Sequence, residues 1–488
     1  MSAFHPTEIK SEKLPLWRKI GYGVGDIYGG GSLVVVNFFY LTFLTDVVRI
    51  SPALAGTVIL ISKVYDSITD PFEGVLSDRT RTALGRRRPY LLAGIPLVFL
   101  SFIALFYPYS AESELARFAL VILSYLFFST IVSIVMLNYN ALQAEITLDY
   151  DERTSLSGLR IFFSTLASIA AALLPLEIVK QFDDVRQGYL VMGVVFGAFF
   201  ALPFIFTFFA ARERQDFQKP PEKFDWRVAF LEPFKVKTFI YALLMYLFAF
   251  VAADTVSNIV VFFMKYYILR GDEANYVAGT LLVFQVLSLP FYSWLSKRTS
   301  KRTGFIVGAA VWLVTMLFSF FIGPGQPFLA VYTFAAIVGL GTGGVIVMMY
   351  AIFPDIPDVD ELVSGERREG VYSALVTLVR KMSSAVAIFF VGLAIDSAGY
   401  IAPIEDVVNG TTQLVEQAQS DGFIFVLRMI FAILPIVLLV VSIYFARRYP
   451  LTPDVHERLN AVLAVKRGHG EATAVTQQEE AELKQLLV

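Results

Sequence analysis

The stretch LSDRTRTALGRRRPYLLAG, residues 76–94, decides the fold because it has a counterpart, LSKRTSKRTGFIVGAA, at residues 295–310. The two stretches start 219 residues apart, and each is a short basic turn between two apolar runs. Basic turns alone can reflect membrane topology, but the shared L-S-x-R-T spacing favours an internal repeat. We therefore predict a chain made of two similar halves.

The composition indicates a multi-pass membrane protein. Of the 488 residues, 56% are hydrophobic and 17% are charged, an apolar share above that of typical soluble domains. A membrane-spanning helix needs roughly 20 mostly apolar residues. Such runs predict an all-α fold with twelve transmembrane helices in two six-helix bundles, at residues 20–47, 53–76, 89–108, 117–140, 160–180, 188–211, 238–265, 276–295, 303–323, 327–350, 371–395 and 422–446.

The distribution of basic residues predicts the orientation. The N-terminal tail and the loops at 77–88, 212–237 and 296–302 hold twenty Lys and Arg residues, whereas the loops on the other side hold six. Because cytoplasmic loops carry an excess of Lys and Arg, we expect both termini in the cytoplasm. The first twenty residues have no continuous apolar core, so we expect no cleaved signal and a place in the cell (inner or plasma) membrane.

The chain is expected to divide into five parts. Its last part contains Thr452 and Pro453, which predict the start of an amphipathic tail helix, followed by flexible polar residues. Two similar bundles with a charged linker are typical of transporters in which one bundle rocks against the other. The predicted parts are a cytoplasmic N-terminal tail (1–19), an N-terminal bundle (20–211), a cytoplasmic linker (212–237), a C-terminal bundle (238–447) and a cytoplasmic C-terminal tail (448–488).

Several kinds of chemistry are excluded by composition. The chain has no cysteine, and its three histidines, His5, His456 and His469, lie in the terminal tails. Thiolate chemistry, cysteine metal sites and an intramembrane histidine relay are therefore unavailable. The spans hold no nucleophile–base arrangement, so we expect no enzyme, no cofactor and no nucleic acid partner.

Ionisable residues inside the spans form the functional shortlist, because each costs at least ~2.5–3.5 kcal/mol to insert. On the second span Lys63, Asp66 and Asp70 lie at i, i+3 and i+7 and therefore share one helix face. The two carboxylates supply oxygen ligands for a monovalent cation such as Na⁺, or share one proton. Ser133 on the fourth span could add a hydroxyl oxygen. Lys63 is itself a candidate for substrate binding or coupling, and the alternative is a structural ion pair between Lys63 and Asp66.

Four further charged residues lie in spans. Asp26 occupies the glycine-rich first span, and Asp254 occupies the seventh, which is the matching first span of the second half. Arg160 begins the fifth span, and Lys381 lies about ten residues into the eleventh. We take these residues as candidates for substrate binding or coupling, and the neighbouring Arg380 is an alternative to Lys381.

The motifs together resemble one known family. KIGYGVGD, FFYLTFLTDVV, YDSITDPFEGVLSDRT, GRRRPYLL, EITLDYDERT, GERREGVYSALVTLVRKMSSAVA and YPLT are similar to segments of the glycoside–pentoside–hexuronide:cation symporters, within the major facilitator superfamily. The resemblance implies that Asp66 and Asp70 bind the coupling cation, Na⁺, Li⁺ or H⁺, and that Ser133 falls at a cation-site hydroxyl. It also implies roles in substrate binding or coupling for Lys381 and Arg160.

The sequence differs from the family at the positions that bind the sugar. Where a sugar-binding member has two carboxylates and a tryptophan, this sequence has Gly30, Met136 and Asn140. A galactoside held in the same way is therefore not implied, and Asn140 becomes a candidate substrate residue. The family is related to sucrose-type transporters and to animal sodium-coupled lysolipid transporters, which keeps a non-sugar substrate open.

The resulting hypothesis is a monomeric secondary transporter that imports a sugar or glycoside together with Na⁺ or H⁺ by alternating access. The cation neutralises Asp66 and Asp70, and Lys381 pairs with these carboxylates when the cation is absent. Cation and substrate must then raise each other's affinity reciprocally. The alternatives are a cation-coupled transporter of a lysolipid or other amphiphile, an efflux carrier and a non-transporting membrane sensor.

Overall fold

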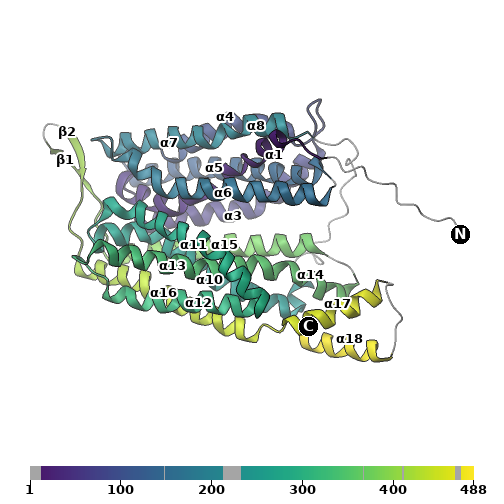
Figure 1. The fold of residues 1–488 in the computed structure, drawn as a ribbon. Coiled ribbons are helices and arrows are strands. Elements are labelled where there is room, and N and C mark those ends of the chain that lie inside the picture. Colours follow the sequence, from purple (N-terminus) through teal and green to yellow (C-terminus); the bar gives the residue numbers. More distant parts are fainter. Residues whose placement is uncertain (1–12, 148, 213–231, 366–367, 409–410, 468–473) are drawn as a thin grey trace.

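The computed structural model describes residues 13–147, 149–212, 232–365, 368–408, 411–467 and 474–488, and nearly all of them are helical (Figure 1). Among the described residues, ten helices are long and apolar enough to cross a membrane, and they coincide with ten of the predicted spans. Helices suit this setting because a helix satisfies its backbone hydrogen bonds within its own segment. The ten segments are Arg88–Leu105, Glu114–Gln143, Glu152–Val179, Val185–Ala210, Lys237–Tyr267, Gly271–Arg298, Lys301–Phe321, Phe328–Ser364, Val371–Ser397 and Asp421–Arg448.

The first two predicted spans are helical but fall outside that set of ten. The second is one long helix, α3 (Pro52–Arg79), whose apolar run is interrupted by Lys63, Asp66 and Asp70. The first is broken into shorter pieces. Its hydrogen bonds change near Val24 and Gly25, where the N–H groups of Gly25 and Ile27 bond to carbonyls three residues back, and again at two π-helical turns. These pieces are α1 (Leu16–Gly23), α2 (Asp26–Val35), η1 (Val36–Tyr40) and η2 (Phe43–Val47).

The internal repeat extends to this local geometry. The π-helical turn η2 has a counterpart in η5 (Phe263–Tyr267), which begins 220 residues later. Each turn ends with an N–H that bonds back to its first residue, and each is followed by a left-handed residue, Arg49 with φ 60° and Leu269 with φ 61°. Such a conformation is uncommon for a residue with a side chain, so its occurrence at matching positions supports the repeat independently of the basic turns.

The remaining elements follow in chain order. The N-terminal half (residues 13–212) continues with α4 (Arg88–Leu105), α5 (Glu114–Ile146), α6 (Tyr150–Val179), α7 (Val185–Ala201) and α8 (Pro203–Ala210). The C-terminal half (residues 232–488) contains η4 (Glu232–Lys235), α10 (Lys237–Phe262), η5, η6 (Gly271–Glu273), α11 (Ala274–Arg298), α12 (Lys301–Phe318), η7 (Ser319–Phe321), α13 (Phe328–Ile352), η8 (Phe353–Asp355), α14 (Ile356–Ser364), α15 (Glu369–Ser397), β1 (Ile404–Val408), β2 (Thr411–Val415), α16 (Asp421–Arg448), α17 (Pro453–Lys466) and α18 (Ala474–Leu487).

The two halves lie one above the other in Figure 1. Within the halves α2 packs on α6, α11 on α13, and α10 on α16. Between the halves the most extensive contacts are made by three pairs of elements, α3 with α15, α6 with α11, and η1 with α10. The helices that carry Asp66, Asp70 and Lys381 therefore lie at the boundary between the halves.

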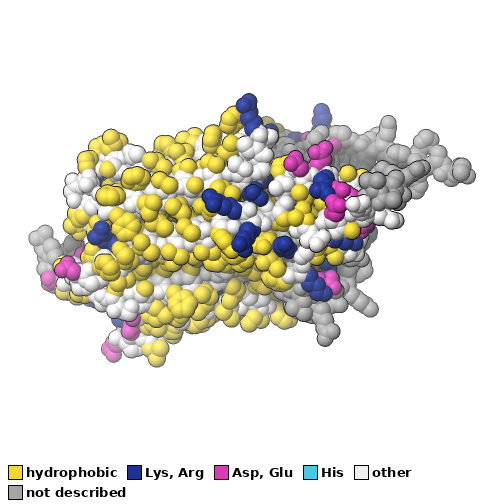
Figure 2. All heavy atoms as spheres, turned by 90° about the horizontal axis from the view of Figure 1, so that it is seen from below, with side chains coloured by type: hydrophobic (Ala, Val, Ile, Leu, Met, Phe, Trp, Pro, Cys, Tyr) yellow, Lys and Arg dark blue, Asp and Glu magenta, His cyan; other side chains and the backbone are white. Residues whose placement is uncertain are grey.

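The two ends of the molecule differ. We call the end that carries the β1–β2 strands the hairpin end, and the end that carries the turns at 80–87 and 299–300 the basic-turn end (Figure 1). Figure 2 shows a face covered along most of its length by hydrophobic side chains, with the acidic side chains gathered towards the two ends. This distribution is the one expected of a protein whose middle lies in hydrocarbon.

Two features correct the expectation from sequence. The fold is not purely α-helical, because β1 and β2 pair as an antiparallel hairpin in which Glu405 lies opposite Leu414. The β-branched residues of these strands favour this structure. The tail is also more ordered than predicted: α17 begins at Pro453 as expected, but a second helix, α18, follows, with Leu483 and Leu487 fully buried.

Candidate functional site

The carboxylate of Asp66 lies buried between α3 and α5. Its Oδ2 accepts from Lys63 Nζ at 2.9 Å, and its Oδ1 accepts from Ser129 Oγ at 2.6 Å. Lys63 reaches it because residues three apart on a helix are neighbours. The side chain of Asp66 is 1% exposed, so its charge depends on these two partners.

Asp70, one turn further along α3, pairs with the other half. Its Oδ2 accepts from Lys381 Nζ of α15 at 2.6 Å. Its Oδ1 is buried, and among the described residues it has no hydrogen-bond partner. Glu73, a further turn along, is also buried. The α3 face therefore carries three carboxylates, and among the described residues two of their oxygens, Asp70 Oδ1 and Glu73 Oε2, are buried without a protein donor.

The hydroxyl that contacts Asp66 belongs to Ser129, and the predicted cation-site role of Ser133 stays a prediction. The two serines lie one helical turn apart on α5, and in the part of the chain that the structure describes the hydrogen bond to Asp66 belongs to Ser129. Within the same residues, no three acidic or histidine side chains converge as a multivalent metal site would require. A monovalent cation needs fewer charged ligands and accepts hydroxyl and carbonyl oxygens.

Three predicted residues meet in a second cluster inside the N-terminal half. Arg160 of α6 lies 3.3 Å from Asp26 Oδ2 of α2, and it donates to Asn140 Oδ1 of α5 at 2.5 Å. It also donates to Gln143, and its guanidinium lies 4.7 Å from the centre of the Tyr139 ring. Asn140 is exposed. The cluster thus presents amide and guanidinium groups beside an exposed position, with the buried Tyr139 ring packed against the guanidinium.

The two adjacent cations of α15 face different partners. Arg380 makes a two-pronged contact with Asp254 of α10, at 2.7 and 3.2 Å, and lies over the ring of Phe250. Lys381 contacts Asp70 of α3 instead. Lys381 therefore bridges the two halves, and Arg380 pairs with Asp254 inside the C-terminal half. Which of the two is the functional cation stays a prediction.

A third cluster ties the halves together at the hairpin end. Asp46 of η2 is buried, and its carboxylate accepts from Lys265 at 2.5 Å, from the Tyr266 hydroxyl at 2.8 Å and from the Tyr400 hydroxyl at 2.5 Å. Thr45 donates to the same group at 2.7 Å. Lys265, Tyr266 and Tyr400 all belong to the C-terminal half, so Asp46 is the acceptor of a latch between the halves.

An exposed set of ion pairs lies beside this latch. Glu405 of β1 pairs with Arg186 at 2.5 Å and with Arg49 at 2.7 Å, both from the N-terminal half. The hydrogen bond and charge of Arg186, and then the charge of Arg49, hold the pKa of Glu405 below its usual range. Deeper in the molecule, Asn275 of α11 donates to the carbonyl of Leu173 on α6 at 2.8 Å. The hairpin end is therefore closed by polar contacts.

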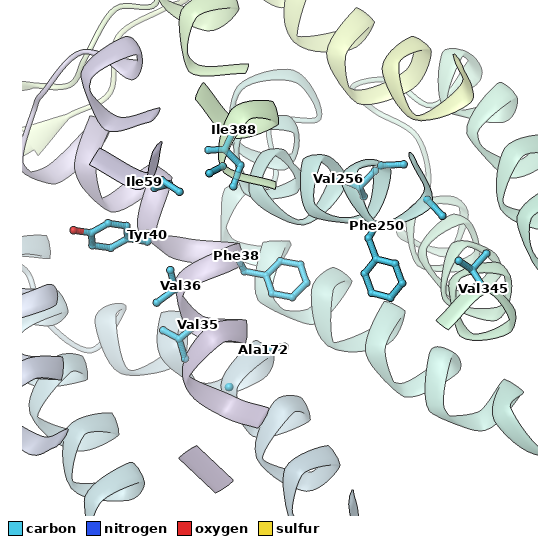
Figure 3. Close-up of a cluster of buried hydrophobic side chains, with 14 of the residues drawn as sticks. Val35, Val36, Phe38, Tyr40, Ile59, Ala172, Phe250, Val256, Val345 and Ile388 are labelled. Atoms are coloured by element: carbon cyan, nitrogen blue, oxygen red, sulfur yellow. The ribbon is translucent and has the colours of Figure 1, made fainter. Parts of the chain in front are cut away.

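Below the latch the boundary is apolar. Figure 3 shows buried side chains from both halves meeting there, among them Val36 and Phe38 of η1, Ile59 of α3, Phe250 of α10 and Ile388 of α15. This apolar layer separates the hairpin-end latch from the cluster around Asp70 and Lys381.

Sequence reasoning missed Asp46, Lys265, Ser129 and the two latch tyrosines. Asp46 and Lys265 lie where spans end, and charges there are ordinary. The repeat does not supply the missing signal, because the π-helical turns η2 and η5 begin 220 residues apart, so Asp46 matches Tyr266 and Lys265 matches Thr45. The latch therefore joins neighbouring positions of the two repeats rather than matching ones.

The fold and these buried pairs are those of a multi-pass membrane transporter of the major facilitator type. The chain belongs to the family described as MFS/sugar transport protein, which matches residues 21–453. The resemblance to glycoside–pentoside–hexuronide:cation symporters is confirmed by this match and by curated relatives that are symporters.

Three relatives cover most of the chain. It is 26% identical to the putative glycoside/cation symporter YagG of Escherichia coli, over 94% of this chain and 97% of that protein. It is 24% identical to the isoprimeverose transporter of Lactiplantibacillus pentosus, over 82% and 84%. It is 22% identical to the sodium-dependent lysophosphatidylcholine symporter 1 of Gallus gallus, over 87% of each chain.

A solved structure shares the fold. The nucleoside transporter NupG superposes with a TM-score of 0.60 at 13% identity, covering 88% of this chain and 98% of that one. Identity at this level carries the fold alone and says nothing about the substrate.

Proposed function

We propose that this protein is a cation-coupled symporter of a sugar or glycoside, with twelve spans and both termini in the cytoplasm, working by alternating access. The observation that carries the proposal is the bridge between Asp70 and Lys381 at 2.6 Å, which joins the halves beside the buried Asp66. A bridge of this kind must break when the halves move apart, so whatever neutralises Asp70 controls the movement.

The coupling cation takes the place of the lysine. Na⁺, Li⁺ or H⁺ enters beside Asp66 and Asp70, where Asp70 Oδ1 offers an oxygen without a donor and Ser129 supplies a hydroxyl. A bound cation neutralises a carboxylate and releases Lys381. The cost of a buried unpaired charge then falls, and the two halves are free to close around substrate.

The cluster around Arg160 is the proposed substrate surface. Its amide and guanidinium groups are suited to hydrogen-bond with sugar hydroxyls. The Tyr139 ring is buried, with the Tyr22 ring stacked on it, and it supports the Arg160 guanidinium. Arg160 already donates to Asn140 and to Gln143. Substrate hydroxyls would replace these bonds, and the net gain depends on how well they reproduce the geometry.

The conformation described is closed at the hairpin end and, in this proposal, open towards the cytoplasm. The latch at Asp46 closes the hairpin end. This closure supports an inward-facing state, from which cation and substrate leave.

Uptake into proteoliposomes tests this proposal. The purified protein is screened for ligand-induced thermal stabilisation by sugars and glycosides, with and without Na⁺, and the stabilising ligand is then used for transport under Na⁺ or pH gradients. Because ligands that bind the same state reinforce each other, the cation must raise substrate affinity by the factor by which substrate raises cation affinity.

The matched variants are Asp70→Asn and Asp272→Asn. Asp70→Asn is expected to abolish the cation dependence of binding and to reduce uptake at least about tenfold, because the neutral amide cannot hold the cation. Asp272 is an exposed carboxylate at the hairpin end, and its variant is expected to behave as the wild type. Substrate binding that ignores Na⁺, Li⁺ and pH in the wild type would overturn the coupling.

The second candidate function is transport of a lysolipid or other amphiphile on the same scaffold. It is favoured by the similarity to the lysophosphatidylcholine symporter. The thermal screen therefore carries a lysophosphatidylcholine arm. Stabilisation in that arm alone, enhanced by Na⁺, would replace the sugar proposal. Counterflow with substrate on either side distinguishes import from efflux.

A further inference from the structure

An apolar crevice opens on the outside of the C-terminal half. It lies between the later part of α12 with η7 and the first turns of α13, with a volume of about 710 Å³. Its walls include Val314, Phe318, Phe321, Ala330 and Phe334. Volumes of ~300–1,000 Å³ are those of sites that hold a small organic ligand. In Figure 1 α12 lies at the edge of the molecule away from the N-terminal half, so the crevice is separate from the proposed transport site.

The positions of the surrounding residues along α12 and α16 show how deep in the membrane the crevice lies. The basic turn at 299–300 precedes α12, so the residues from 310 onwards lie in the part of α12 nearer the hairpin end. On α16, Arg428 is seven residues after the first residue, about 10 Å along the helix. The crevice therefore lies in the leaflet at the hairpin end, with Arg428 near the level where lipid headgroups meet acyl chains.

Two arginines reach the rim of the crevice. Arg428 Nη2 lies 3.5 Å from the carbonyl oxygen of Phe320, directly before the wall residue Phe321, and its guanidinium lies over the Tyr267 ring. Arg270 Nη2 donates to the carbonyl oxygen of the wall residue Gln326 at 2.8 Å.

Among the described residues, neither arginine forms an ion pair with a carboxylate at the rim. Within the described part of the chain Arg428 has no carboxylate within 4.0 Å, in contrast to the paired cations Lys265, Arg380 and Lys381. Arg270 Nη1 is buried and, among the same residues, has no hydrogen-bond partner. A cation in a span normally has a partner, and its absence is a reason to look for a ligand.

We propose that this crevice binds one glycerophospholipid, with an acyl chain between α12 and α13 and the phosphate against Arg428. The apolar walls match an acyl chain, since the polar atoms around the space are few and the aromatic side chains are many. The phosphate supplies the negative charge that Arg428 lacks, and arginine is suited to phosphate by its planar fork of donors. The ligand comes from the surrounding leaflet, which is where the crevice opens.

Native mass spectrometry of the full chain, with phosphatidylglycerol or diacylglycerol added in detergent, tests the proposal. The wild type is expected to retain phosphatidylglycerol and to lose diacylglycerol, which has the acyl chains without the phosphate. Arg428→Gln is expected to weaken phosphatidylglycerol retention about tenfold, because a hydrogen bond to a charged group is lost. Arg428→Lys, which keeps the charge, is expected to restore most of it.

A second pair of variants tests the crevice itself. Val314→Trp fills the wall, whereas Leu317→Trp adds the same ring to an exposed position of α12 outside the wall. The first is expected to reduce phosphatidylglycerol retention and the second to leave it unchanged, with thermal unfolding used to confirm that both are folded. Equal retention of the two lipids by the wild type, or equal retention by both tryptophan variants, would overturn the proposal.

Discussion

The latch at the hairpin end gives the sharpest prediction. Asp46 is 4% exposed and accepts hydrogen bonds from Lys265, Tyr266 and Tyr400 of the other half. Asp46→Asn keeps the shape and removes the charge. The Lys265 ammonium, on a side chain that is 16% exposed, is then left with Glu416 at 3.0 Å as its carboxylate partner.

The free energy that Asp46→Asn removes from hairpin-end closure follows from the loss of this charge partner of Lys265. Removing one partner of a buried ion pair costs about 3–5 kcal/mol. Glu416 is mostly exposed, and the asparagine still accepts from hydroxyl groups, so we expect about 2–3 kcal/mol to be lost from hairpin-end closure. At 1.4 kcal/mol per tenfold, the equilibrium moves by about 30- to 150-fold. A closed end favoured about 100 to 1 would become nearly equal in population with the open end.

Distance measurement between spin labels reports this shift. The chain has no cysteine, so Glu112→Cys and Leu329→Cys place one label on each half at exposed positions of the hairpin end. Double electron–electron resonance is expected to show one short distance in the parent and an added longer distance with Asp46→Asn. Asp272→Asn, at the same end, is the control. An unchanged distribution for Asp46→Asn would refute the assignment of the latch.

Two further predictions concern the same architecture. Arg186 lowers the pKa of Glu405, so the contribution of Glu405 to hairpin-end closure is present above the usual glutamate pKa and is lost as pH falls through the lowered value. Spin-label distances are expected to stay constant from pH 7 to about 5 and to lengthen below about pH 4. Glu405→Gln is expected to remove this dependence. A Cβ on Gly30 would lie 2.2 Å from Ser164 Oγ, so Gly30→Ala is expected to cost about 1–3 kcal/mol of stability and to lower the thermal midpoint. The control is Gly158→Ala, which has open space around it and is expected to leave the midpoint unchanged or raised. Equal midpoints for the two variants would count against close packing at Gly30.

The packing of Gly30 also changes how its sequence position is interpreted. The sequence comparison placed Gly30 where a sugar-binding relative has a site residue. In the structure this glycine lets α2 approach α6, and its carbonyl accepts from Ser168 at 3.1 Å. Small residues serve this purpose at helix interfaces.

The helices were predictable from sequence because a membrane span must satisfy its own backbone and present apolar side chains. The hairpin and α18 were not, although both left signals. The Asn-Gly pair between the β1 and β2 sequences is typical of hairpin turns. In the tail, Leu483 and Leu487 are spaced by four residues, and both are buried. Local polarity outweighed these short patterns when the segments were predicted as loop.

The ionisable residues within the spans were predictable from the sequence, and their pairings were less so. The cost of intramembrane charge singled out Asp26, Asp66, Asp70, Asp254 and Lys381, and each has an ion-pair partner in the structure. Which partner each one meets depends on how far one helix is shifted along another. A shift of one turn decides which of two serines of α5 contacts Asp66. A rotation of one residue decides which of two cations of α15 contacts Asp70.

The pairings divide the charges into two kinds with different consequences for transport. Asp26 with Arg160, and Asp254 with Arg380, each lie within one half, so a rigid rocking of the halves leaves them intact. Asp46 with Lys265 and Asp70 with Lys381 cross between halves. In the first pair the carboxylate of Asp46 accepts from four protein donors, which suits a gate. The second has a free carboxylate oxygen beside Asp66, which suits a cation. In the proposed cycle cation binding at Asp70 therefore lowers the barrier at the centre, and the Asp46 latch sets how long the hairpin end stays shut.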